Sequence, residues 1–182
     1  MFFFDNSLYG KNSLQKQIKI VNQFVLNSPN SNDNISTVLL SQGETSYNKS
    51  FYPILTDDFG EFYITLSSIA NQTPSQGNIS YFFLTSEVAS KSRLNENNIY
   101  TKNPIIVYFI DSYINQIENT RMIINMMENF FTTKIRVVSI IFDTMKTSAA
   151  TFFTKNSDFV HLSVDSRETV QWLFSQYQKI SK

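Results

Sequence analysis

Cysteine is absent from this 182-residue chain, glycine and proline occur four times each, and there is a single histidine. The lack of cysteine excludes disulfides, thiolate metal sites and cysteine nucleophiles, but it leaves both reducing and oxidising compartments open. With so few glycines, no phosphate-cradling G-x-G-x-x-G or G-x-x-x-x-G-K-[ST] motif follows any predicted strand. A G-x-S-x-G elbow is also missing, so nucleotide binding and Ser-His-Asp hydrolysis both lack support.

An excess of one charge is lacking too, because 15 basic residues balance 15 acidic ones. No global field therefore favours nucleic acid, and no apolar run approaches the length of a membrane span. Seventeen Phe and nine Tyr favour a packed core over disorder. We expect a single soluble domain over residues 1–182, without a nucleic-acid partner or membrane insertion. The chain carries no signal peptide and starts directly on a predicted strand, which suggests a fragment or a gene model without its leader.

The strongest strand signal is the run Ile105–Ile110, which Asp111 and Ser112 follow. A continuous β-branched and aromatic run of this length is typical of a central strand in a parallel sheet, covered on both faces. Similar runs predict further strands at residues 2–5, 35–40, 135–142 and 159–164, with a short edge strand at 47–52.

Helical spacing of apolar residues separates these strands and predicts helices at residues 14–26, 59–69, 114–127, 147–154 and 167–179. Asn12 or Ser13 could cap the first of them. Met122 and its neighbouring methionines are interpreted as core packing. Residues 79–85 could be a strand by composition, but Phe82, Val88 or Ala89, and Leu94 can also line one side of a helix that runs to about Arg93. The alternation of strand and helix predicts an α/β fold with a mostly parallel sheet.

Acidic residues follow two of the predicted strands, in Asp5-Asn6-Ser7 and in Asp111-Ser112. In parallel sheets the carboxyl ends of the strands share one edge, where ligands commonly bind. Carboxylate and hydroxyl oxygens suit Mg²⁺ or Ca²⁺. The alternative is that both aspartates cap the segments that follow them, and the spacing favours this reading. His161 lies inside an apolar strand, where a packed histidine is more common than a catalytic base.

At this point the chain resembles a von Willebrand factor type A (vWA) domain. The opening D-N-S resembles the family's D-x-S-x-S motif, and residues 105–111 resemble the strand that carries its second aspartate. Residues 135–143 and 159–163, with the terminal amphipathic helix, are similar to the family's last two strands and closing helix. The match is closest to divergent A domains beside lectin or CUB modules in secreted invertebrate proteins.

The resemblance implies a three-layer, doubly wound, Rossmann-like sheet of six strands with helices on both faces. It implies a helix at residues 79–94 and a metal-ion-dependent adhesion site (MIDAS) for Mg²⁺ or Ca²⁺. Asp5, Ser7 and Asp111 would be its ligands, and Ser80 would stand at the family's threonine position. The implied function is an extracellular, non-enzymatic adhesion or protein-binding module with an unidentified protein ligand.

The motif departs from the family pattern at Tyr9, where a second small hydroxyl is expected, and Ser13 is too far along to replace it at that spacing. Asp111 is followed by Ser112-Tyr113 where many members have glycine. A degenerate site is therefore one interpretation. Two alternatives stay open: a metal-dependent hydrolase that uses Asp5 and Asp111, and a structural domain with no active top face.

Overall fold

The computed structural model describes residues 1–27, 39–41, 58–74, 85–86, 105–111, 119–125 and 135–179. Ser80, the edge strand expected at residues 47–52 and most of the segment 79–94 lie outside these residues. Thr85 and Ser86 are described, and both are helical. In the described parts of the chain, no helix combines the length and the apolar character needed to cross a membrane.

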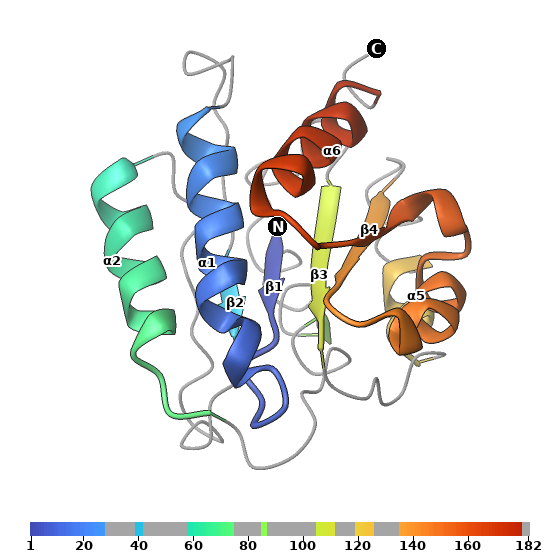
Figure 1. Cartoon of the computed structure of the whole chain (residues 1–182), viewed down its shortest axis with the longest axis horizontal. Helices are drawn as coiled ribbons and strands as arrows, with labels where there is room; N and C mark the ends of the chain where they lie inside the picture. The colour runs from blue at the N-terminus through green and yellow to red at the C-terminus, as the bar shows by residue number, and fades with distance from the viewer. Residues whose placement is uncertain are drawn as a thin grey trace.

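One parallel sheet forms the centre of the molecule (Figure 1). Its order is β2-β1-β3-β4-β5, and all four pairings are parallel. The strands are β1 (Phe2–Phe4), β2 (Leu39–Ser41), β3 (Ile105–Ile110), β4 (Arg136–Ile141) and β5 (Val160–Leu162). The five described strands confirm the predicted α/β class and the central place of β3.

The main helices follow the strands in alternation. They are α1 (Lys11–Leu26), α2 (Phe59–Ala70), α5 (Thr147–Thr154) and α6 (Ser166–Gln178), with 3-10 turns at η1 (Thr144–Lys146) and η2 (Ser157–Phe159). Asp58 and Asp165 cap α2 and α6 by accepting backbone N–H groups of the first turn, and this satisfies donors that a helix start leaves unpaired.

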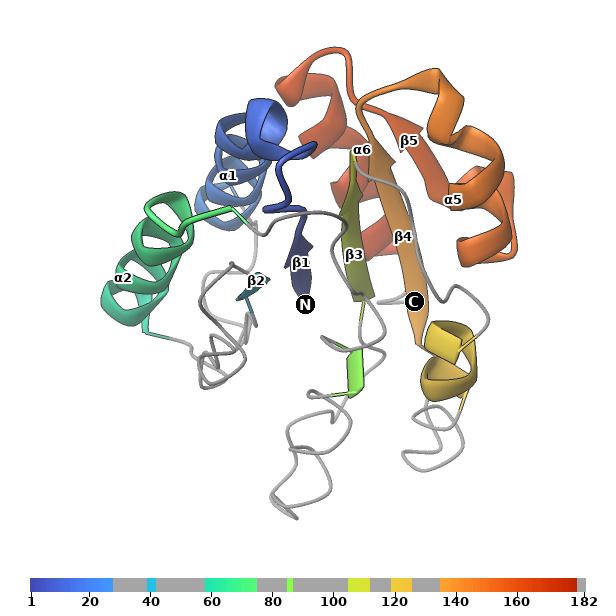
Figure 2. The same cartoon turned by 90° about the horizontal axis from the view of Figure 1, so that it is seen from below.

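Helices cover both faces of the sheet, as Figures 1 and 2 show. Because side chains alternate along a strand, Phe2 and Phe4 enter the core shared with α1, α2 and α6, whereas Phe3 faces the opposite side. There Phe3 stacks on Tyr108 with the ring centroids 4.6 Å apart. The Tyr108 hydroxyl meets Thr85 at 2.7 Å, so the helical pair 85–86 lies on this second face. The fold is therefore doubly wound.

Two local predictions were wrong. Gly10, and not Asn12 or Ser13, is the N-cap residue of α1, and no side chain caps this helix. Met122 is exposed and not part of the core, because Thr120 and Ile124 are the buried residues of its segment. Two residues along a helix turn the side chain by about 200°, so these neighbours face opposite sides.

Candidate functional site

The carboxyl edge of the sheet, the lower edge in Figure 1, brings the ends of β1 and β3 together. The two strands pair in parallel with Phe3 opposite Tyr108, so each delivers the residue after it to the same edge. Asp5 follows β1 and Asp111 follows β3. The backbone N–H of Asp111 donates to Asp5 Oδ2 at 2.8 Å, which joins the two strand ends directly.

The Asp5 carboxylate is fully buried and organises the loop that follows it. Its Oδ1 accepts hydrogen bonds from the Ser7 hydroxyl at 2.7 Å and from the Ser7 backbone N–H at 3.2 Å. Ser7 Oγ in turn accepts the Gly10 N–H at 3.0 Å. The aspartate therefore acts as a loop cap, as the cap interpretation predicts, and it also binds the end of a second strand.

Glycine is required at position 10 by the close approach of the loop to Asp5. A Cβ on Gly10 would lie 2.4 Å from the Asp5 carbonyl oxygen and 2.5 Å from Asp5 Oδ1. Both distances are shorter than any ordinary non-bonded contact. The absence of a side chain at this position lets the start of α1 lie directly over the aspartate.

Gln17, in the second turn of α1 and fully buried, fixes the backbone of Asp5. Its Oε1 accepts the Asp5 N–H at 2.9 Å, and its Nε2 donates to the Asp5 carbonyl at 3.1 Å and to Ser13 Oγ at 2.8 Å. The amide thereby provides hydrogen-bond partners for two buried backbone groups. Hydrogen bonds from α1, together with the position of Asp5 at the end of β1, therefore fix where the Asp5 side chain lies.

Ser13 joins this network from the first turn of α1. Its side chain is nearly buried, donates to the Gly10 carbonyl at 3.0 Å and accepts a hydrogen bond from Gln17 Nε2 at 2.8 Å. That Ser13 cannot replace, at the motif's spacing, the hydroxyl expected where Tyr9 stands remains a prediction. The first turn of α1 folds back over the end of β1, so eight residues of sequence separation become a short distance in space.

Electrostatics at the edge are unfavourable for the charged form of Asp111, which is half-buried. Burial raises the pKa of its carboxyl, and the charges of Asp5 and Asp143 raise it further. The hydrogen bond from Ser13 and the charge of Lys146 lower the pKa and only partly compensate. A positive charge at this point would relieve the repulsion between the carboxylates.

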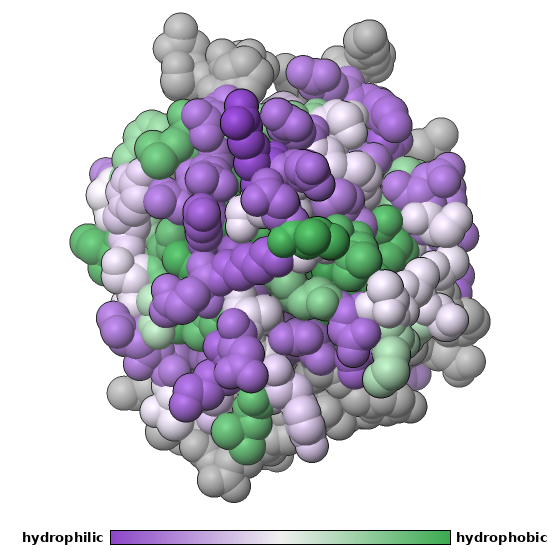
Figure 3. Space-filling view, in the orientation of Figure 1, coloured by the Kyte–Doolittle hydropathy of each residue, from purple (hydrophilic) through white to green (hydrophobic). Residues whose placement is uncertain are grey.

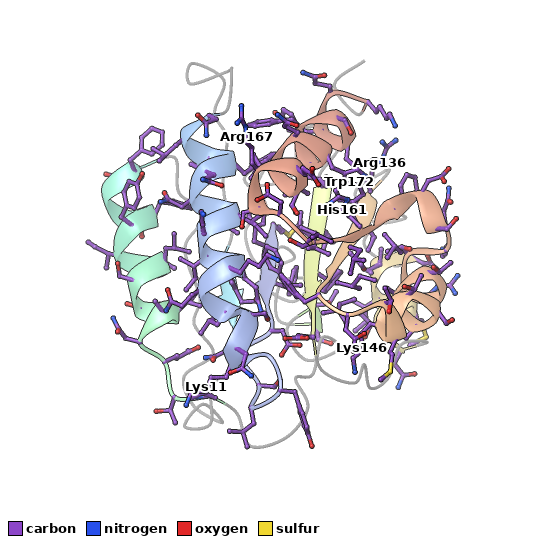
Figure 4. All side chains as sticks on the ribbon, viewed as in Figure 1. Lys11, Arg136, Lys146, His161, Arg167 and Trp172 are labelled. Atoms are coloured by element: carbon purple, nitrogen blue, oxygen red, sulfur yellow. The ribbon has the colours of Figure 1, made fainter. Side chains whose placement is uncertain are left out.

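Exposed apolar side chains lie on three loops of the same edge. They are Leu8 and Tyr9 after β1, Met145 after β4 and Val164 after β5. The Tyr9 side chain is 64% exposed and so points away from the buried Asp5 network. Figure 4 also places Lys11 and Lys146 at this edge. We call Leu8, Tyr9, Met145 and Val164 the apolar rim.

Lys16 holds part of the rim in place. Its ammonium group donates to the carbonyls of Ser163 and Val164 at 2.5 and 2.9 Å, and lies 5.6 Å from the centroid of the Phe142 ring. These contacts tie the loop between β5 and α6 to α1. Figure 3 shows a hydrophobic patch on this face of the molecule. Leu162 and Val164, at the end of β5 and in the loop after it, are exposed hydrophobic residues.

His161 is a packed residue, as its apolar strand predicts. Its ring stacks on Trp172 of α6 at a centroid distance of 4.8 Å, and Figure 4 places both away from Lys11 and Lys146 at the carboxyl edge. Burial lowers the pKa of the imidazole, although the nearby charge of Glu168 raises it. A lowered pKa favours the neutral form of the ring.

The structure thus brings together three of the residues singled out from the sequence, Asp5, Ser7 and Asp111, and says nothing of Ser80. Sequence reasoning missed Gly10 and Gln17 and excluded Ser13. One signal was present: Ser13 and Gln17 are four residues apart, on the helix face that also carries buried Leu14 and Val21.

The donor set fits a hard divalent cation in kind. Asp5 and Asp111 supply carboxylate oxygens, Ser7 and Ser13 supply hydroxyls, and oxygen ligands of this type are those that Mg²⁺ and Ca²⁺ prefer. Within the described residues, no group of three or more His, Cys, Asp or Glu side chains forms a cation site. A cation here would therefore depend on two carboxylates with hydroxyls and water.

Comparison with known proteins gives matches at the level of structure. The sequence matches no protein-family model and no curated protein sequence. Manganese-loaded TRAP protein from Plasmodium vivax has a similar structure, with a TM-score of 0.70 at 15% identity; the match covers 94% of this chain and 70% of that one. The VWA domain of SpRpn10 has a TM-score of 0.62 at 20% identity, with 94% and 92% covered.

Proximal thread matrix protein 1 from the mussel byssus is a third similar structure. Its TM-score is 0.65 at 13% identity, and the match covers 94% of this chain but 44% of the byssus protein. Another structure of that protein has zinc in its MIDAS motif. Identities this low establish a shared fold, and the residues of the present site have to be argued from their own geometry.

Proposed function

Because the chain has a von Willebrand factor type A-like fold, we propose that it is a non-enzymatic protein-binding or adhesion module. It presents the carboxyl edge of its sheet to a protein ligand. The observation that carries the proposal is the Asp5 carboxylate, whose hydrogen bonds hold Ser7 and the start of the Asp111 loop together at the edge where such domains bind.

A divalent cation, Mg²⁺ or Ca²⁺, belongs to this proposal. Asp5, Ser7 and Asp111 would hold it, and Ser80 is proposed for the family's threonine position. When bound, the cation would offer an open coordination position to a carboxylate of the ligand. Manganese in the TRAP structure and zinc in the byssus protein support a cation in this fold. The resemblance to secreted A domains, and the byssus origin of one neighbour, support an extracellular setting.

The surroundings of the edge indicate what the ligand carries. Lys11 and Lys146 favour an acidic side chain, and the apolar rim favours apolar residues beside it. Interfaces of this kind combine a few apolar anchors with a polar contact that fixes orientation. The proposed partner is therefore a protein segment with an exposed carboxylate flanked by apolar side chains.

A thermal melt with and without Mg²⁺, Ca²⁺ or Mn²⁺ tests the cation. At about 100 times its Kd, a cation bound only to the folded state stabilises by about 2.7 kcal/mol. For a chain of this length that is a rise in Tm on the order of 5–10 °C. Asp111→Asn should lose the rise, because the half-buried amide has no charge to offer the cation.

Asp58→Asn is the matched control. Asp58 is an acidic residue that caps α2, and asparagine is an equally good cap, so both the stability and the rise in Tm should persist. Identical melting curves with and without the cations in the intact protein would remove the cation from the proposal. They would leave only a cation-independent binding role for the edge.

A further inference from the structure

A hollow of about 740 Å³, open to solvent, lies against the C-terminal half of α2, the helix at the flank of the molecule in Figure 1. It is lined by Tyr63, Ile64, Ser67 and Ser68 of the helix and by the turn at residues 71–73. These side chains carry hydroxyls, amides and apolar carbons, and none of them is charged. Such a lining suits a neutral ligand with many hydroxyl groups, and it offers a charged ligand no ionic partner.

The turn itself is Asn71-Gln72-Thr73, an N-x-[ST] acceptor motif for N-glycosylation. Asn71 and Thr73 are both exposed. Among the described residues this is the one such motif, since the other three begin at Asn34, Asn48 and Asn78. We propose that Asn71 carries an N-linked glycan and that the first sugar of this glycan lies in the hollow. The inference rests on the extracellular setting of the proposed function, because such motifs are modified in secreted proteins.

The folded turn accommodates the linkage. An asparagine amide has two N–H groups, and Asn71 Nδ2 uses one to donate to the Ser67 carbonyl at 2.9 Å. Transfer from a lipid-diphosphate-linked oligosaccharide forms a bond between Asn71 Nδ2 and C1 of the sugar, breaks the bond between C1 and the phosphate oxygen, and releases the lipid diphosphate. The proton of the second N–H is lost to a base of the transferase. The glycosylated amide therefore keeps the N–H that bonds Ser67.

Hydrogen bonds hold the turn from two sides. The backbone N–H of Asn71 donates to the Ser67 carbonyl at 3.1 Å, which ties the turn to α2. Gln72 Oε1 accepts a hydrogen bond from Asn6 Nδ2 at 3.2 Å, which ties it to the loop after β1. The point where the glycan is attached is therefore fixed relative to the hollow.

An open hollow suits a tethered sugar better than a free one. A free sugar loses translational freedom when it binds, whereas a sugar attached to Asn71 is present at an effective concentration on the order of millimolar or above. The side chains of Tyr63 and Ile64 are 37% and 69% exposed, and they offer apolar surface to the C–H face of a sugar ring. A glycan at this place would cover two exposed apolar side chains with a bulky, soluble group.

Site-specific mass spectrometry tests the linkage in the full chain, secreted from eukaryotic cells behind a signal peptide. Peptide-N-glycosidase in heavy-oxygen water converts a glycosylated asparagine to labelled aspartate, so the Asn71 peptide should carry the label. Asn156 is the internal control for spontaneous deamidation, because it is exposed but has Asp158 in place of the hydroxyl residue of the motif. Thr73→Val should lose the label at Asn71, and Thr73→Ser should keep it, because serine retains the hydroxyl.

Hydroxyl-radical footprinting of the same three proteins tests where the sugar lies. Tyr63 should be oxidised more in Thr73→Val than in the unmodified chain or in Thr73→Ser, because the hollow then holds no sugar. Tyr177 is the matched control, a partly buried tyrosine on α6, which Figure 1 shows on the far side of α1. Its oxidation should be equal in all three proteins.

Three results decide the matter. A label at Asn71 that depends on the hydroxyl at position 73, with protection of Tyr63, supports the proposal. An unlabelled Asn71 peptide in the secreted chain overturns it. A labelled Asn71 with equal oxidation of Tyr63 in all three proteins overturns the placement of the sugar in the hollow. Cation and ligand binding, measured on unglycosylated protein from bacterial cells, decide the proposed function separately.

Discussion

Substitution of Gly10 by alanine gives a direct test of the way the site is built. The backbone of Gly10 has a φ of −81°, which alanine adopts without strain, so the objection to a side chain is one of space. The new Cβ would lie 2.4 Å from the Asp5 carbonyl oxygen, 2.5 Å from Oδ1 and 2.7 Å from Cγ. Real Cβ atoms essentially never come within 3.0 Å of such atoms.

The Asp5 atoms that the new Cβ would contact cannot move away without breaking hydrogen bonds. Gln17 holds the backbone of Asp5 from both its N–H and its carbonyl, and Ser7 and Asp111 hold the carboxylate. Overpacking costs about 1–3 kcal/mol. Loss of the hydrogen bond from Gly10 N–H to Ser7 adds about 1 kcal/mol. We expect a total of about 3 kcal/mol, which lowers Tm by roughly 6–12 °C at this chain length.

Gly60→Ala is the matched control, measured in the same urea and thermal unfolding series. Gly60 also lies at the start of a helix, but a Cβ there would meet only Asp58 Oδ1, at 3.0 Å. Alanine gains up to about 1 kcal/mol of helix propensity over glycine, so the stability should change by less than about 1 kcal/mol. A loss of less than about 1 kcal/mol in Gly10→Ala would refute the close packing of the loop on Asp5.

Three further outcomes follow from the same contacts. Gln17→Leu removes the two hydrogen bonds that Gln17 makes to the buried N–H and carbonyl of Asp5, and urea unfolding should show a loss of about 3 kcal/mol. Lys16→Met removes two hydrogen bonds to the loop after β5. Because the ammonium group is only half-buried, the free energy of unfolding should fall by roughly 1 kcal/mol. Amide hydrogen exchange in that loop should become faster. Because burial lowers the pKa of His161, the unfolded state binds more protons below its ordinary pKa of about 6.5, so the free energy of unfolding should fall as pH falls through that value. His161→Phe, which retains a ring against Trp172, should remove this slope, and the NMR titration of the only histidine should show the lowered pKa.

The order of the elements could be predicted because each signal is local. The run from Ile105 to Ile110 is apolar at every position, and a strand with both faces covered requires this. The period of the α1 and α6 sequences predicts their buried faces, including Leu14 and Leu173. Helix caps were harder to predict. Asp58 is a residue type that commonly caps helices, and it caps α2. The start of α1 at Gly10 depends instead on close packing against Asp5, for which the neighbouring sequence gives no signal.

The site was predictable only in part, for a related reason. The juxtaposition of Asp5 and Asp111 follows from parallel pairing of neighbouring strands, which strand signals indicate. The parts played by Ser13 and Gln17 depend on how far α1 folds back over the end of β1. This close packing is possible because Gly10 has no side chain. The sequence shows a glycine at this position, but it does not show how near Gly10 comes to Asp5.

Tyr9 shows that a large side chain can replace a small hydroxyl in this loop while the hydrogen bonds around Asp5 are kept. Its side chain is exposed, while its neighbours Ser7 and Gly10 remain bound to the Asp5 network. A bulky residue at this position therefore leaves the buried carboxylate undisturbed and adds an aromatic surface beside it. On the proposed function, Tyr9 joins Leu8, Met145 and Val164 in contacting the ligand. Aromatic anchors contribute strongly to protein interfaces, so Tyr9→Ser should weaken binding of the protein ligand while leaving Mn²⁺ affinity unchanged.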